Sequence, residues 1–126
     1  MERFTGFDIS FVDPVTGYYY VADRSNSAVD VVNGASNALI GQVGAGLFGR
    51  QQATTALSGP DGVVVVDSAG VATLYAGNGS PNPADNSTLL SFDVTDPTAP
   101  VEQGSVNTGG SCRLDEMSFD PLGNLP

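Results

Sequence analysis

Basic residues are scarce in this chain of 126 residues, and two kinds are missing altogether. The chain has no histidine and no lysine, and its four arginines stand against 14 Asp and Glu residues, which gives a net charge of −10. Without histidine it can form no Ser-His-Asp triad, Cys-His pair, His-ligated zinc site or His general base. A surface this acidic repels phosphate backbones and anionic lipid, so we expect neither nucleic acid nor a membrane surface as a partner.

Cysteine and long apolar runs are equally scarce. Cys112 is the single cysteine and cannot form a disulfide within the chain. No stretch approaches the roughly 18 apolar residues of a transmembrane helix, so membrane insertion is not expected. The first residues have neither the basic region nor the apolar core of a signal peptide, and none is predicted within this sequence.

Glycine and proline are abundant instead, with 16 and 8 residues. Together they make up almost a fifth of the chain, against about 12% on average, and both disfavour helix interiors. Short runs of β-branched and aromatic residues alternate with turn clusters along the whole sequence, which predicts an all-β fold of antiparallel meanders. The predicted strands cover residues 7–12, 18–23, 28–33, 38–43, 62–67, 71–77, 88–94, 101–106 and 114–119.

The predicted strands recur with a period of about 53 residues. Asp13, Asp67 and Asp120 each close a first strand, at spacings of 54 and 53, and we expect each to bond its own downstream amides in a turn. Ala22 and Ala76, near the ends of the second strands, are also 54 apart. Four strands per period of about 50 residues are typical of β-propeller blades. A β-sandwich, the main alternative, does not explain a common period.

The segment 17–43 resembles a YVTN-type propeller repeat. It runs from Tyr20-Val21 through an Asn/Ser turn and a Ser-Asn turn into an Ile/Val strand, with Ala22-Asp23 where the family has Thr-Asn. Residues 59–63 and 67–70 also resemble the entries of NHL-type blades. The resemblance implies a six- or seven-bladed parent, often secreted or on the cell surface in bacteria and archaea, and frequently a binding or scaffold protein.

On this interpretation the chain is one partial β-propeller domain, residues 1–126. Blade one covers about residues 5–44, an inter-blade segment residues 45–59, blade two about residues 60–107, and the first strand of a third blade lies within residues 108–126. Propellers close with about four to eight blades. The chain is therefore expected to be a fragment whose partners include the remaining blades of a parent protein. Assembly of several short chains into a ring is the alternative.

The candidate site lies at the entries of the predicted first strands. Asp8 and Asp115 stand five residues before their closing aspartates, and Asp61 stands six before, a mismatch that a β-bulge would absorb. First-strand entries ring one mouth of a propeller channel. There Asp8, Asp61 and Asp115, with Glu116 beside the last, would converge on a divalent cation such as calcium. Resemblance to gluconolactonase-type propellers, which hold an axial metal, points the same way. The alternative is that these aspartates cap loop amides and close turns.

Two functions remain open at this point. The first is a non-enzymatic binding or scaffold propeller of YVTN type, extracellular, periplasmic or on the cell surface, with a protein or small-molecule ligand at one face and no required cofactor. The second, implied by lactonases with similar blades, is a metal-dependent lactonase-like hydrolase in which the metal polarises a carbonyl and a carboxylate acts as base. The Asn- and Asp-rich insertion at residues 78–86 is a further candidate for ligand contacts.

Overall fold

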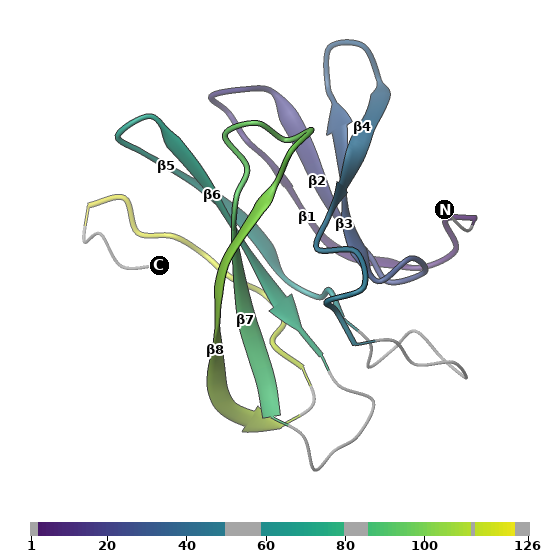
Figure 1. Cartoon of the computed structure of the whole chain (residues 1–126), viewed down its shortest axis with the longest axis vertical. Coiled ribbons are helices and arrows are strands. Elements are labelled where there is room, and N and C mark those ends of the chain that lie inside the picture. The colour runs from purple at the N-terminus through teal and green to yellow at the C-terminus, as the bar shows by residue number, and fades with distance from the viewer. Residues whose placement is uncertain (1–2, 50–58, 80–85, 112, 123–126) are drawn as a thin grey trace.

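The computed structural model describes residues 3–49, 59–79, 86–111 and 113–122, which form strands and turns and no helix. Eight strands make two four-stranded antiparallel sheets, each a meander in which sequence neighbours pair (Figure 1). The strands of the first sheet are β1 (Phe7–Val12), β2 (Tyr18–Asp23), β3 (Ala28–Asn33) and β4 (Ala38–Val43). Those of the second sheet are β5 (Val63–Ser68), β6 (Val71–Asn78), β7 (Asn86–Asp93) and β8 (Val101–Ser111). The all-β prediction is confirmed.

The strands of the first sheet have the predicted limits, and those of the second differ at their ends. β8 runs on to Ser111, five residues beyond the prediction, because it stays paired with β7 as far as Asn86. The ninth predicted strand, residues 114–119, is wrong: these residues form no strand, and an isolated bridge occurs at Asp120. Its β-like composition was not sufficient, since a strand also needs a ladder partner along its length. No helix of the described part of the chain could span a membrane.

The hydrophobic core lies between the two sheets. The inner face of the first sheet contributes Tyr20, Ala22, Val29 and Val31, all fully buried. The side chains that meet them from the second sheet form its inner face and are Val63, Val65, Leu74, Ala76, Leu90 and Phe92. Phe48, from the segment after β4, joins this core with its ring 6.2 Å from that of Phe92. The two meanders therefore stack face to face and share one core.

One backbone hydrogen bond recurs along the molecule with the sequence period. The Ile9 N–H of β1 donates to the Asp61 carbonyl at 3.3 Å, and the Gly62 N–H donates to the Leu114 carbonyl at 3.4 Å. Donors and acceptors are each 53 residues apart. In Figure 1 the first sheet, the second sheet and the yellow segment that ends at residue 122 follow one another across the molecule. Residues 114–119 thus lie against the second sheet where β5 lies against the first.

The three closing aspartates do not all play the predicted role. The side chain of Asp13 accepts a hydrogen bond from the Val15 N–H at 2.8 Å, and that of Asp120 accepts one from the Leu122 N–H at 2.9 Å, as expected. Asp67 instead remains in the β5 ladder opposite Ala72. The hairpin turn there is the two-residue Ala69-Gly70 pair, which has positive φ at both positions and so leaves Asp67 inside the strand.

Candidate functional site: a charge cluster between the repeats

Three of the four predicted metal ligands come together in the structure. Asp8 lies in β1, Asp61 two residues before β5, and Asp115 beyond the end of β8. The side chain of Asp61 is fully buried, whereas that of Asp115 is 46% exposed. Glu116, the fourth predicted ligand, is exposed, and the described contacts do not connect it to the other three. The sequence therefore predicted the convergence of Asp8, Asp61 and Asp115.

Two arginines that were not predicted to belong to the site lie among these carboxylates. Arg24 follows β2; its guanidinium forms ion pairs with Asp8 and with Asp61, whose Oδ1 is 3.0 Å from Nη2. Arg113 pairs through Nη2 with Asp8 Oδ2 at 2.5 Å and with Asp115 Oδ2 at 2.7 Å. Its Nε also lies 3.4 Å from Asp61 Oδ1. We call these five residues, Asp8, Arg24, Asp61, Arg113 and Asp115, the junction cluster.

Backbone features position each member of the junction cluster. A register shift between Phe7 and Ser10, a β-bulge, includes Asp8; the predicted bulge thus occurs in β1 rather than beside Asp61. The Arg24 N–H donates to the Gly6 carbonyl at 3.1 Å, which fixes the chain after β2 beside the start of β1. Gly62 allows the chain at Asp115 to approach, since a Cβ at position 62 would lie 1.6 Å from the Asp115 carbonyl oxygen.

Burial dominates the electrostatics of the cluster. Burial raises the pKa of Asp61 to about 6, although the charges of Arg24 and Arg113 lower it. Neither carboxylate oxygen of Asp61 has a hydrogen-bond partner among the described residues, so its stabilisation comes from the ion pairs with the two guanidinium groups. Burial also lowers the pKa of Arg24. Removing either arginine would therefore leave the buried carboxylate of Asp61 with a single guanidinium partner.

The donor set of the junction cluster does not suit a divalent cation. Its three carboxylates already contact two guanidinium groups, whose positive charges repel a metal ion at the same position. Among the described residues no group of three or more Asp, Glu, Cys or His is arranged to hold a metal ion. The arrangement is an ion-paired contact that connects the first sheet with the chain before β5 and after β8.

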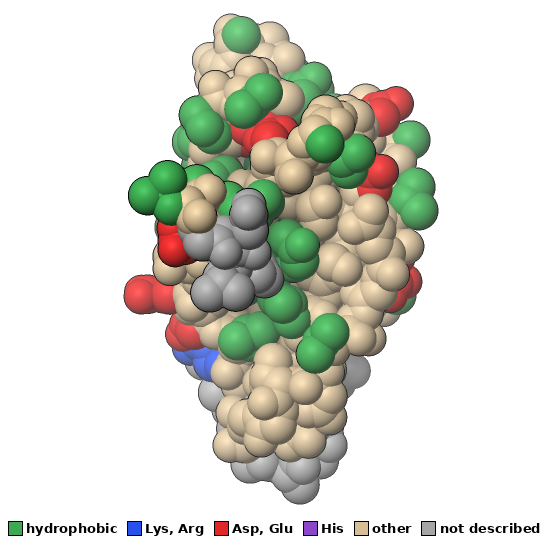
Figure 2. Space-filling view, turned by 90° about the vertical axis from the view of Figure 1, so that its left-hand side faces the viewer, with side chains coloured by type: hydrophobic (Ala, Val, Ile, Leu, Met, Phe, Trp, Pro, Cys, Tyr) green, Lys and Arg blue, Asp and Glu red, His purple; other side chains and the backbone are tan. Residues whose placement is uncertain are grey.

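Sequence reasoning overlooked Arg24 and Arg113 because they hold no matching place in the repeat. The available signal was the scarcity of basic residues, four arginines against 14 acidic residues. Because a buried carboxylate needs a partner, it is expected to pair with one of these few arginines. Figure 2 shows acidic side chains along the margins of the face it presents, and the basic side chains visible there lie directly beside acidic ones.

A second carboxyl pair lies where β1 and β5 end. Asp13 is fully buried, and Asp67 lies beside it. Burial, then the charge of Asp13 and a hydrogen bond with it, raise the pKa of Asp67. Burial and the charges of Asp13 and Asp67 also raise the pKa of Tyr20, which is in the core between the sheets. Asp13 and Asp67, at the ends of the first strands of the two sheets, thus lie together as well.

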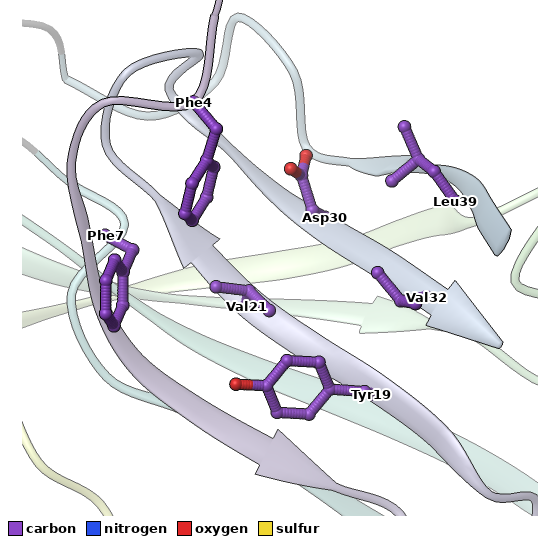
Figure 3. Close-up of a pocket in the computed structure, with 7 residues that line it drawn as sticks. All are labelled: Phe4, Phe7, Tyr19, Val21, Asp30, Val32 and Leu39. Carbon is purple, nitrogen blue, oxygen red and sulfur yellow. The ribbon is translucent and has the colours of Figure 1, made fainter. Parts of the chain in front are cut away.

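The face of the first sheet that points away from the second sheet carries a hollow of about 420 Å³ (Figure 3). Its walls are mostly apolar, and they are Phe4, Phe7, Tyr19, Val21, Val32 and Leu39, with Asp30 as the acidic member. The rings of Phe4 and Phe7 stack with centroids 5.6 Å apart. Asp30 is almost fully buried and accepts a hydrogen bond from Gln42 Nε2 at 2.8 Å. Burial raises the pKa of Asp30 to about 6.

Part of the predicted ligand loop is not covered by the structure. Residues 80–85 of that loop lie outside the described residues, as does Cys112, the single cysteine.

The chain matches no family model, no curated protein and no solved structure.

Proposed function

We propose that the chain is a segment of a YVTN-type β-propeller that acts as a non-enzymatic binding or scaffold protein. The two sheets are two blades of this propeller, and residues 114–119 begin a third. The proposal places the chain in a larger secreted or cell-surface protein that binds a protein or a small molecule at one face. Its support is the resemblance of residues 17–43 to that repeat, together with the stacking described above.

The recurring hydrogen bond is the observation that carries the architectural part. A β-sandwich needs two sheets and no third layer, whereas residues 114–119 approach the second sheet through the same contact by which β5 approaches the first. Repetition of one stacking operation is typical of propellers, in which each blade packs on the next. This argues for an array of sheets over a two-layer sandwich.

The junction cluster supports the non-enzymatic part of the proposal. A carboxylate that serves as a metal ligand or general base must be open to its metal or substrate. Asp61 is instead fully buried between Arg24 and Arg113, and Asp8 contacts both guanidinium groups. These aspartates act as ion-pair partners that connect repeats.

The convergence of Asp8, Asp61 and Asp115 favours one alternative, a metal-dependent lactonase-like hydrolase. In that case Arg24 and Arg113 would have to leave the cluster to admit a divalent cation such as calcium. The loss of four ion pairs that involve Asp8 or Asp61 opposes such a rearrangement.

Calcium binding and lactone hydrolysis distinguish the two functions. We expect calcium chloride to leave the melting temperature of the full chain unchanged, and an aldonolactone to hydrolyse at the background rate with or without calcium. Two results together would overturn the scaffold proposal. One is calcium-dependent hydrolysis of the lactone. The other is an increase in melting temperature with calcium that is abolished by Asp115→Asn but not by the control Glu102→Gln, at an exposed position of β8.

A further inference from the structure

The outer face of the first sheet corresponds to a face that is buried in the second sheet. The recurring hydrogen bond makes Ile9 equivalent to Gly62, and therefore Ser10 equivalent to Val63. Ser10 pairs across the strands with Val21 and then Asp30, and Val63 pairs in the same way with Ala76 and then Leu90. Position by position, Val21 corresponds to Ala76 and Asp30 to Leu90.

The same registers extend the correspondence across the hollow. Val12, Tyr19 and Val32 pair in sequence across the first sheet, as Val65, Leu74 and Phe92 do across the second. The residues of the second sheet in these positions are buried because the first sheet packs on them. Four of their counterparts on the first sheet line the hollow, namely Tyr19, Val21, Asp30 and Val32, and a fifth, Val12, is 57% exposed. The outer face of the first sheet thus corresponds to the face of the second sheet on which the first sheet packs, but no described sheet covers it.

We propose that this outer face receives a further four-stranded sheet of the same repeat array, which packs on it as the first sheet packs on the second and encloses Asp30. The proposal rests on the array architecture proposed above. Where the second sheet has Leu90, this interface has a carboxyl group, and a buried carboxyl group requires a hydrogen-bond donor. Gln42 Nε2 already donates to this carboxyl group at 2.8 Å, so the incoming sheet has to supply only an apolar surface.

A second copy of this chain does not fit the same position. In such a stack the far face of the second sheet of one copy would meet the outer face of the first sheet of the next. Leu114, Met117 and Ser118 already lie on that far face, beside Val64 and Tyr75. They would separate the two sheets. The occupant is therefore another repeat of the same polypeptide.

An extended chain tests this inference. Residues 1–58 are joined in front of residues 6–126, which preserves the period because Gly6 and Gly59 are 53 residues apart. The added unit offers the inner face of the first sheet to the outer face of the original first sheet. Val12→Glu, at the counterpart of the buried Val65, is made only in the original unit and compared in the 126-residue and extended chains. Val101→Glu, at a 61% exposed position of β8, is the matched control.

We expect Val12→Glu to leave the urea midpoint of the 126-residue chain nearly unchanged, because Val12 is 57% exposed there, and to lower that of the extended chain by about 0.5–1 M. Val101→Glu should change neither. Asp30→Leu should raise the midpoint of the extended chain more than that of the 126-residue chain, because the added apolar face encloses the carboxyl group. Equal effects of Val12→Glu in both chains, or an added unit that stays unfolded, would overturn the interface. Calcium binding and lactone hydrolysis do not enter this comparison, so the scaffold proposal is judged separately.

Discussion

At the scale of single residues, the junction cluster surrounds a buried carboxylate with positively charged side chains. Asp61 is fully buried, and its carboxylate is compensated by the guanidinium groups of Arg24, after β2, and Arg113, after β8. Breaking a buried ion pair costs more than the pair contributes, because one charge is left in a low-dielectric environment. The cluster therefore makes the junction between repeats sensitive to single substitutions.

Arg24→Met tests this sensitivity. Methionine keeps much of the side-chain volume and removes the charge that faces Asp8 and Asp61, so we expect the free energy of unfolding to fall by about 3 kcal/mol at pH 7.5. Urea denaturation measures the change. Arg3→Met, at an exposed position before β1, is the control and should be neutral. Equal midpoints for both variants would mean that Arg24 does not stabilise the junction.

At the scale of elements, the predicted strand limits were correct where a strand pairs with its sequence neighbour across a hairpin. They were wrong where pairing depends on a partner distant in the sequence. Alternating β-branched residues and turn clusters predicted β1 to β4 correctly, since each pairs with a sequence neighbour across a short turn. Residues 114–119 have the same composition but no ladder partner along their length. Asp67 was assigned to a turn because the Ala69-Gly70 hairpin is shorter than the loop after Asp13.

Gly62→Ala tests how residues 113–122 attach to the second sheet. A Cβ at this position would meet the Asp115 carbonyl oxygen at 1.6 Å, so the segment must move away and the Leu114 hydrogen bond must break. We expect a loss of about 2 kcal/mol in the free energy of unfolding and faster hydrogen exchange at the Gly62 amide position. Gly104→Ala in β8, where a Cβ meets nothing within 4 Å, should have a much smaller effect. Slow exchange at position 62 in the variant would contradict the described contact.

At the scale of the whole molecule, the burial of carboxyl groups in an acidic chain determines how stability depends on pH. A net charge of −10 opposes compaction, and several carboxyl groups are nevertheless buried in the fold. Burial raises the pKa of both Asp30 and Asp61 to about 6, so the folded state binds more protons than the unfolded state between roughly pH 4 and 6. Stability should therefore increase on mild acidification.

We expect the free energy of unfolding to rise by about 2 kcal/mol from pH 7.5 to about pH 5, and to fall as the pH rises through 6. Below about pH 4 it should fall again, because hydrogen bonds lower the pKa of Asp93 and Asp96 and these are then protonated. Urea denaturation across this range measures the profile. The double variant Asp30→Asn/Asp61→Asn should flatten the rise, and Glu102→Gln should leave it intact. A stability maximum at neutral pH in the parent chain would refute this account.

The sequence by itself determined the all-β class and the four-strand antiparallel meanders, because these follow from local alternation and turn chemistry. It also indicated that Asp8, Asp61 and Asp115 would meet, since all three stand at the entries of predicted first strands. Only the tertiary structure decided that Arg24 and Arg113 lie between these carboxylates and that Asp30 lies in an unfilled apolar face. Such contacts join residues of different repeats, and side-chain pairing across a junction depends on burial and distance, which local sequence patterns do not encode.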